Sequence, residues 1–413
     1  MSSLAIGIDF GTTNSSLARA TPDGEIVLLT ENYRSILYLE KIARTIRCWS
    51  GPAAIEEYLE AESKGRLVQS LKSFLSSRTL KGTEVFGRLM TLEDLIARIL
   101  RDLREKAEAQ YGTKVETAVV GRPVRFVGSS SEDDDTFAEE RLRGAFRLAG
   151  FDSVLFELEP VAAAHFYQSS LDHDELILIG DFGGGTSDFS LLRVGRGAAH
   201  GASRLLGNSG LGLAGDAFDA RIVRHLVSPA LGRGSLVRSF DKVLPAVPNW
   251  VYAKLEHWHH LSFLRTGAVI NMLKTTLAEA FEPAKLEALI QVIEEDLGYY
   301  LHRAVQQIKR DLSTEFTAHF SFHGIEATVQ RSEFESWIAE DLTKIEGCID
   351  GLMSKAGADR KDIDMIFLTG GTSFVPAVRR IFESRFGADR IRTGNEFTSV
   401  ARGLALMARG QTS

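Results

Sequence analysis

The pattern of apolar and polar residues predicts two hairpins with the same internal order. The first covers residues 4–20, and its turn is Gly11-Thr12-Thr13-Asn14. The second covers residues 175–194, and its turn is Gly183-Gly184-Gly185-Thr186. Each consists of a continuous apolar strand, a polar turn rich in glycine and threonine, and a returning apolar strand. We interpret the two hairpins as a diverged internal repeat, which predicts two similar lobes that face each other.

The rest of the chain is predicted to be mainly helical. Apolar residues at helical spacing predict helices over residues 91–109, 139–150 and 376–386. Shorter apolar runs predict strands over 114–123 and 363–369, and a solvated polar loop is expected over 129–135. From residue 228 to about 306 prolines interrupt the pattern, and long helices are predicted only after Pro283.

Composition excludes several classes of protein. The 413 residues carry 48 Lys and Arg against 55 Asp and Glu, so the net charge of −7 argues against nucleic acid or an anionic membrane as a partner. Length suggests two or three domains, and two cysteines are too few for a disulfide framework or a zinc site. No apolar run has membrane-spanning length, and the N-terminal residues do not resemble a signal peptide. The composition therefore predicts a cytoplasmic protein.

The two turns have the chemistry of a phosphate site. Glycine allows backbone N–H groups to approach an anion, a threonine hydroxyl adds a donor, and a nearby aspartate can hold Mg²⁺ through water. One such turn is equally explained by an ordinary hairpin, whereas two copies favour a phosphate clamp.

The chain contains no P-loop motif. The run from Gly210 to Gly215 fits G-x-G-x-x-G, but it lacks the surrounding βαβ pattern, so we do not predict a dinucleotide site there. The helix that follows Gly215 can still contact the same phosphates with its N-terminus.

Several motifs resemble one family. The sequences GIDFGTTNS at 7–15, EPVAAA at 159–164 and DFGGGTSD at 181–188 are similar to the ATPase domain of heat-shock-protein-70 (DnaK-like) chaperones, and LTGGTS at 368–373 resembles their adenosine loop. The stretches 70–75, 119–123 and 205–210 look closer to the short YegD-type members. The resemblance runs from about residue 4 to 408.

The resemblance implies the actin-like ATPase fold, an α/β architecture of two ribonuclease-H-like lobes around a nucleotide cleft. Lobe I would comprise residues 1–175 with 376–413 returning to it. Lobe II would comprise residues 176–375, including a helical subdomain around 228–310. Mg²⁺ and ATP or ADP are the implied ligands.

The resemblance also assigns roles to individual residues. The phosphates would be held by Gly11, Thr12, Thr13 and Asn14 from one turn, by Gly184, Gly185 and Thr186 from the other, and by the loop at Gly215. Asp9, Glu159 and Asp181 would surround Mg²⁺ and its waters, with Asp188 in support. Lys72, Glu159, Asp181 and Thr186 are the catalytic candidates, Lys72 reaching the γ-phosphate and the attacking water. The adenosine would be held by Lys309, Arg310, Ser313, Gly370, Gly371, Ser373 and Phe374.

The chain also departs from the family pattern. Gln306 replaces an acidic ribose contact, Phe374 replaces a stacking arginine, and Phe397 replaces a late aspartate. An aromatic face can still cover a purine, but these changes bear on base selectivity. The chain ends at Ser413, just after the ATPase region, so capture and release by an attached peptide-binding domain is not expected.

The resulting interpretation is a Mg-dependent chaperone-like protein that binds ATP and hydrolyses it slowly, and whose nucleotide state is read by a protein client or co-chaperone of unknown identity. Three alternatives stay open: a nucleotide-gated binding module without hydrolysis, a sugar-type kinase of the same superfold, and a filament-forming actin relative.

Overall fold

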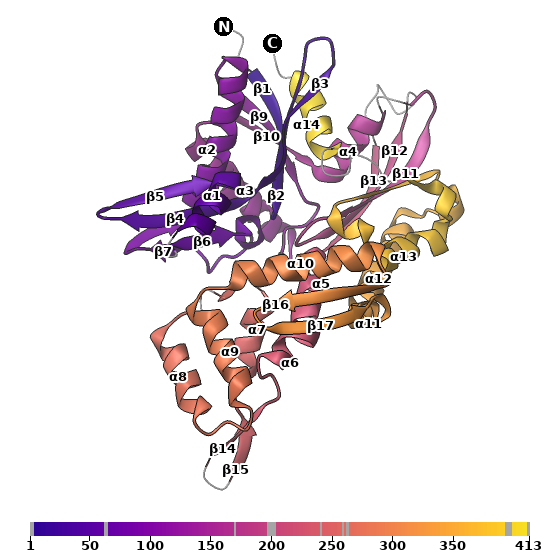
Figure 1. Cartoon of the computed structure of the whole chain (residues 1–413). Helices are drawn as coiled ribbons and strands as arrows, with labels where there is room; N and C mark the ends of the chain where they lie inside the picture. The colour runs from indigo at the N-terminus through magenta and orange to yellow at the C-terminus, as the bar shows by residue number, and fades with distance from the viewer. Residues whose placement is uncertain are drawn as a thin grey trace. The chain divides into compact units, whose positions relative to one another are not determined.

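Two five-stranded sheets carry the two predicted hairpins (Figure 1). The computed structural model describes residues 4–61, 65–168, 171–195, 204–239, 242–257, 260–261, 264–392 and 399–410, without the side chains of 31, 32 and 239. The first sheet has the order β10 (Ser153–Leu158), β9 (Val115–Arg122), β1 (Leu4–Phe10), β2 (Asn14–Ala20), β3 (Ile26–Arg34). The second has the order β19 (Ile391–Arg392), β18 (Met365–Thr369), β11 (Glu175–Phe182), β12 (Ser187–Val194), β13 (Arg204–Leu211).

The two sheets share strand order and strand direction. In the first, β1 pairs antiparallel with β2 and parallel with β9; in the second, β11 pairs antiparallel with β12 and parallel with β18. The outer pairs agree as well, since β9–β10 and β18–β19 are parallel while β2–β3 and β12–β13 are antiparallel. The internal repeat predicted from the hairpins is therefore confirmed, and it extends over five strands rather than two.

Helices and smaller sheets complete the chain. The helices are α1 (Gly51–Glu60), α2 (Leu92–Tyr111), α3 (Glu132–Ala149), α4 (Glu159–Gln168), α5 (Gly215–Ile222), α6 (Ser228–Ala230), α7 (Asn249–Leu255), α8 (Gly267–Leu277), α9 (Pro283–Glu294), α10 (Gly298–Thr314), α11 (Arg331–Trp337), α12 (Ala339–Ala356), α13 (Pro376–Phe386) and α14 (Ser399–Arg409). The smaller strands are β4 (Ile36–Ile42), β5 (Thr45–Ser50), β6 (Arg66–Gln69), β7 (Gly82–Val85), β8 (Arg88–Thr91), β14 (Leu236–Ser239), β15 (Lys242–Pro245), β16 (Thr317–Phe322) and β17 (Ile325–Gln330). The predicted helices over 91–109 and 376–386 are confirmed as α2 and α13, and the long helices after Pro283 as α9 and α10.

The prediction of a loop over 129–135 was wrong for its last four residues. Helix α3 begins at Glu132, and Ser131 caps it by accepting a hydrogen bond from the Asp134 backbone. Carboxylates in a first turn are stabilised by the exposed N–H groups there, so four consecutive acidic residues suit a helix start as well as a loop. Asp135 is buried and accepts a hydrogen bond of 2.9 Å from the Phe126 backbone.

Helices α4 and α14 pack between the two sheets. Their small apolar residues share one core with Ala5 and Val119 of the first sheet and with Ile177 and Leu192 of the second. The close contact between the two helices depends on Gly403 of α14, where an added Cβ atom would lie 1.7 Å from the carbonyl oxygen of Ala162 in α4. Helices α2 and α3 cover the opposite face of the first sheet.

We expect Gly403→Ala to lower the free energy of unfolding by about 2 kcal/mol, because the added methyl group must push α14 away from α4. Urea denaturation followed by circular dichroism measures this change. Gly347→Ala in α12 is the matched control, since nothing lies within 4 Å of its added Cβ. Equal stability of the two variants would contradict the packing argument.

The chain divides into two compact units, each of which is described by itself. Unit 1 comprises Met1–Gly215, Lys344–Ser373 and Val378–Ser413, and unit 2 comprises Asp216–Thr343 and Phe374–Ala377. Both five-stranded sheets belong to unit 1, whereas the hairpins β14–β15 and β16–β17 and helices α7 to α11 belong to unit 2. The lobe boundary at 175/176 stays a prediction. In the described parts of both units, no helix is long and apolar enough to cross a membrane.

Candidate functional site

The two predicted turns approach each other within unit 1. A Cβ atom added to Gly185 of the second turn would lie 3.9 Å from Thr12 Oγ1 of the first turn. The same atom would lie 3.6 Å from Ser73 Oγ and 2.9 Å from Val127 Cγ2. The structure therefore brings both turns and the segment that carries Lys72 to one place, while their roles toward a nucleotide stay predictions.

Both turns are tightly closed by contacts within their own backbone. At Gly11 an added Cβ would lie 2.1 Å from the carbonyl oxygen of Asn14, so the first turn tolerates no side chain at this position. In the second turn the Gly183 N–H donates to the Thr186 carbonyl over 2.9 Å. Tight glycine turns of this kind can present N–H groups to an anion.

Lys72 lies on a short 3₁₀ turn, Leu71–Phe74, and its side chain is buried. Its Nζ atom is 2.7 Å from Oε1 of Glu159, the buried first residue of α4. Burial alone lowers the pKa of Lys72, but the charges of Glu159 and Asp9 outweigh it, so the net pKa is raised. The ammonium group is therefore charged at neutral pH.

Three aspartates surround this ion pair. Burial raises the pKa of Asp9 to about 8, and the Glu159 charge adds to the shift. Burial and Glu159 also raise the pKa of Asp181 to about 6, against a hydrogen bond of 2.8 Å that Thr369 Oγ1 donates to it. Repulsion between these carboxylates makes a shared cation favourable.

Asp188 of β12 completes the cluster. It lies directly opposite Asp181 in the antiparallel register of β11 and β12. Burial raises its pKa well above the usual range, and Glu159 and Asp181 raise it further. The backbone N–H of Arg125 donates to Asp188 over 3.4 Å. Three carboxylates therefore interact with Lys72, and Asp188 interacts with two of these three, which leaves an excess of negative charge when all four are ionised.

The donor set fits a hydrated divalent cation. Among the described residues, no three His, Cys, Asp or Glu side chains gather closely enough to hold an ion directly. Mg²⁺ commonly keeps several waters and binds through one or two carboxylates together with phosphate oxygens. Asp9, Glu159 and Asp181 therefore fit Mg²⁺ bound mainly through water.

A third turn packs against the second. At Gly370 the φ angle is +80°, and an added Cβ would lie 2.0 Å from the carbonyl oxygen of Phe182. The carbonyl of Gly183 accepts hydrogen bonds from Thr372 Oγ1 over 3.5 Å and from the Gly215 N–H over 3.4 Å. Ser373 Oγ donates to the Gly370 carbonyl over 2.6 Å, which closes the turn that also contains Gly371. Gly215 and the Gly370 turn are thus fixed to the second phosphate turn.

The other adenosine candidates belong to unit 2. On α10, Lys309 Nζ pairs with Oδ1 of the buried Asp219 at 2.6 Å, and Ser313 Oγ donates to the Lys309 carbonyl over 2.9 Å. Arg310 donates to the Gln307 side chain over 2.6 Å, and Phe374 is 51% exposed. Phe397 lies outside the described residues. A role of these residues toward adenosine stays a prediction.

Sequence reasoning missed two residues that hold candidate site residues in place, one in each unit. Thr369 orients Asp181 from the neighbouring parallel strand, and Asp219 neutralises Lys309. The sequence offered a signal for Thr369, because this residue directly precedes Gly370 in the motif at 368–373. Asp219 offered no signal, since a lone acid near the start of a helix is common.

Comparison with known proteins agrees with this geometry. The Hsp70 protein family model matches residues 63–234 and 282–411. A DnaK chaperone protein of Thermosipho africanus is 28% identical over 409 residues, and one of Thermotoga petrophila is 26% identical over 412 residues. Both alignments cover 98% of this chain, which spans only 58% and 59% of the lengths of those relatives. Together with the repeated sheet, the family match confirms the actin-like α/β fold: this chain belongs to the Hsp70 protein family.

Proposed function

We propose that this chain binds ATP with Mg²⁺ and hydrolyses it slowly, as the nucleotide-dependent part of a chaperone. One observation carries the proposal: two glycine turns from repeated hairpins meet the Lys72 segment beside a buried cluster of carboxylates. Family membership supports a chaperone-type ATPase domain, and DnaK chaperones are among the relatives.

The residues present can perform the step. Phosphoryl transfer requires positioning and charge neutralisation more than covalent chemistry. The N–H groups of the turns at Gly11–Asn14 and Gly184–Thr186 would bind phosphate oxygens, and the Lys72 ammonium would neutralise charge that develops on the γ-phosphate. Glu159 or Asp181 would orient the attacking water. Mg²⁺, when bound through Asp9, Glu159 and Asp181, would supply further neutralisation of the phosphates.

A second function is a nucleotide-gated binding module without significant hydrolysis. The observation that favours it is the 2.7 Å ion pair between Lys72 and Glu159. Both groups are assigned to hydrolysis, and in this arrangement each is engaged by the other. A protein that only binds nucleotide could keep this pair intact in both nucleotide states.

In either case we propose that a protein partner, a client or a co-chaperone, reads the nucleotide state. Ligands that bind one conformation better than another shift the population toward it, which is the physical basis of such a readout.

Titration calorimetry with ADP and ATP, beside a phosphate-release assay, tests the proposal. We expect Mg-dependent binding of both nucleotides and slow release of phosphate from ATP. Gly185→Leu should weaken binding about tenfold or more, because its side chain would collide with Val127 and fill the space beside Thr12. Gly347→Leu, on an open helix surface, is the control. Binding without release favours the module, and no binding to the wild-type chain contradicts both functions.

A further inference from the structure

The segment that carries Lys72 is too short to hold its own shape. It is a single four-residue 3₁₀ turn, and Ser70 before it adopts a left-handed conformation with a φ of 54°. Such turns have poor hydrogen-bond geometry, and a non-glycine residue with positive φ persists only where its surroundings impose it. The position of Lys72 must therefore be fixed by contacts from outside the turn.

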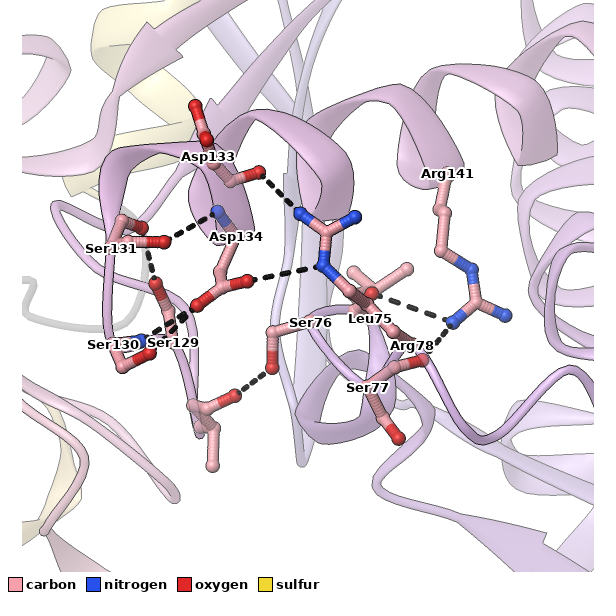
Figure 2. A network of polar contacts seen from close by, with 11 residues as sticks. Leu75, Ser76, Ser77, Arg78, Ser129, Ser130, Ser131, Asp133, Asp134 and Arg141 are labelled. Carbon is pink, nitrogen blue, oxygen red and sulfur yellow. Dashed lines mark hydrogen bonds and ion pairs between the residues drawn. The ribbon is translucent and has the colours of Figure 1, made fainter.

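Arg141 of α3 supplies three such contacts. Its Nη1 atom donates to the backbone carbonyls of Phe74 and Leu75 over 3.4 Å each and to that of Ser77 over 3.1 Å. Figure 2 shows this guanidinium group pointing to the segment at Leu75 and Ser77. One buried side chain thus holds three carbonyls within five residues of Lys72.

The charge of Arg141 is balanced where it is buried. Its side chain is 8% exposed, and Nε and Nη2 donate to the two oxygens of Glu93 over 2.5 and 3.4 Å. A guanidinium group can serve a carboxylate and several carbonyls at once because its five donors lie in a fixed plane. A lysine at this position could not reproduce the pattern.

Two further contacts hold the same segment, at different strengths. Ser76 Oγ donates to the Val127 carbonyl over 2.5 Å, and a Cβ atom added to Gly185 of the second turn would lie 2.9 Å from Val127 Cγ2. Arg78 reaches Asp134 and the Asp133 carbonyl over 3.3 Å each (Figure 2). The Arg78 side chain is 57% exposed, so this surface pair contributes less than the buried contacts.

We propose that Arg141 is a positioning residue for Lys72: by holding the last carbonyl of the 3₁₀ turn and two carbonyls that follow it, Arg141 fixes the ammonium group relative to the two phosphate turns. The role in turnover rests on the proposed ATPase function. The structural part of the proposal, that Arg141 orders residues 71–78, depends only on the hydrogen bonds described above.

The test compares Arg141→Ala with Arg143→Ala in the full chain. Arg143 lies on the same helix, but its hydrogen bonds run to Glu139 and to the Val154 carbonyl. Hydrogen exchange measured by mass spectrometry reports how well ordered the backbone of residues 71–78 is. Steady-state kinetics with ATP and Mg²⁺ report kcat and KM. We expect faster exchange of this segment only in Arg141→Ala. Its kcat should fall about 10- to 100-fold with KM little changed, because a displaced group loses alignment rather than ground-state binding.

A second variant guards against simple loss of folding. Arg141→Ala leaves Glu93 without its partner, so the double variant Arg141→Met with Glu93→Gln removes both charges and is expected to show the same kinetic defect. A pocket of about 490 Å³ beside Arg141 and Phe137 opens the vacated space to solvent. Millimolar guanidinium chloride is therefore expected to restore part of the turnover of Arg141→Ala, but none of that of Lys72→Ala.

The outcomes separate the inference from the proposed function. Unchanged exchange of residues 71–78 in Arg141→Ala, or kcat equal to that of Arg143→Ala, overturns the positioning role. If residues 71–78 exchange faster in Arg141→Ala but the wild-type chain releases no phosphate, Arg141 orders this segment and the proposed ATPase function is contradicted. Failure of guanidinium to restore any turnover in a folded Arg141→Ala variant also counts against the proposal.

Discussion

Replacement of Lys72 by alanine is expected to lower ATP turnover by about two to three orders of magnitude while ADP still binds. The ammonium group is buried, charged and paired with Glu159, and it lies in the segment that approaches both phosphate turns. Removal of one preorganised charged donor from a catalytic site costs about 10²- to 10³-fold in rate. The backbone N–H groups of the turns remain, so phosphate binding should survive. Single-turnover phosphate release and calorimetry measure the two effects separately.

The main control addresses charge balance. Lys72→Ala leaves four carboxylates together without their lysine, which could alter folding or cation affinity instead of catalysis. The double variant Lys72→Ala with Glu159→Gln restores the balance and should recover stability but not turnover. Lys81→Ala, at an exposed lysine, should behave as the wild type. Wild-type turnover in a folded Lys72→Ala variant would remove this lysine from the mechanism and leave the binding module as the better function.

The elements that sequence predicted well are those whose signal is local. The strand ending near Asp9 and the strand ending near Asp181 are continuous apolar runs followed by glycine turns, and the structure shows them as β1 and β11. Likewise, the proline that starts α13 lies at a helix start signal, and Phe386 ends this helix as predicted. A short-range pattern is sufficient where one buried face and one turn decide the conformation.

Other parts depend on contacts between distant residues and gave no such signal. Arg141 and Asp135 look like solvated charges in the sequence, yet both are buried, because each satisfies backbone groups of an irregular segment. Prolines interrupt the pattern from residue 228 to about 306, and within this range the family model leaves residues 235–281 unmatched. Irregular, proline-interrupted segments lack the periodicity on which sequence reasoning rests.

The structure brings part of the candidate site together, while the roles of its residues stay predictions. The structure brings Asp9, Lys72, Glu159 and Asp181 together. Because these residues lie far apart in the sequence, only the repeat and the family resemblance could suggest this arrangement. The adenosine roles of Lys309 and Phe374, and the closer likeness to the YegD-type members, remain predictions. The first prediction concerns residues of unit 2 and the second concerns relations within the family. The repeat in unit 1 determines neither of them.

The stability of the nucleotide-free and metal-free chain is expected to fall as the pH rises from 5 to 8. Burial raises the pKa of Asp9 to about 8, whereas an unfolded aspartate ionises near pH 4. Between these values the folded state binds more protons than the unfolded state, so the free energy of unfolding decreases with pH. The contribution is fully present below about pH 4, is lost progressively up to about pH 8 and changes little above it. Its size over this range is about 5 kcal/mol.

Asp9→Asn isolates this effect because asparagine keeps the shape of the side chain and never ionises. Urea denaturation in a chelator should show the variant gaining stability over the wild type as the pH rises, while Asp152→Asn, at an exposed carboxylate, should follow the wild-type curve. Millimolar Mg²⁺ should flatten the wild-type curve, because a bound cation favours the ionised carboxylates and lowers their pKa values. It should do so less in Asp9→Asn, which lacks one of the proposed outer ligands. Parallel curves for the wild type and Asp9→Asn would show that Asp9 is not buried among like charges, and the cation site inferred from that cluster would lose its electrostatic basis.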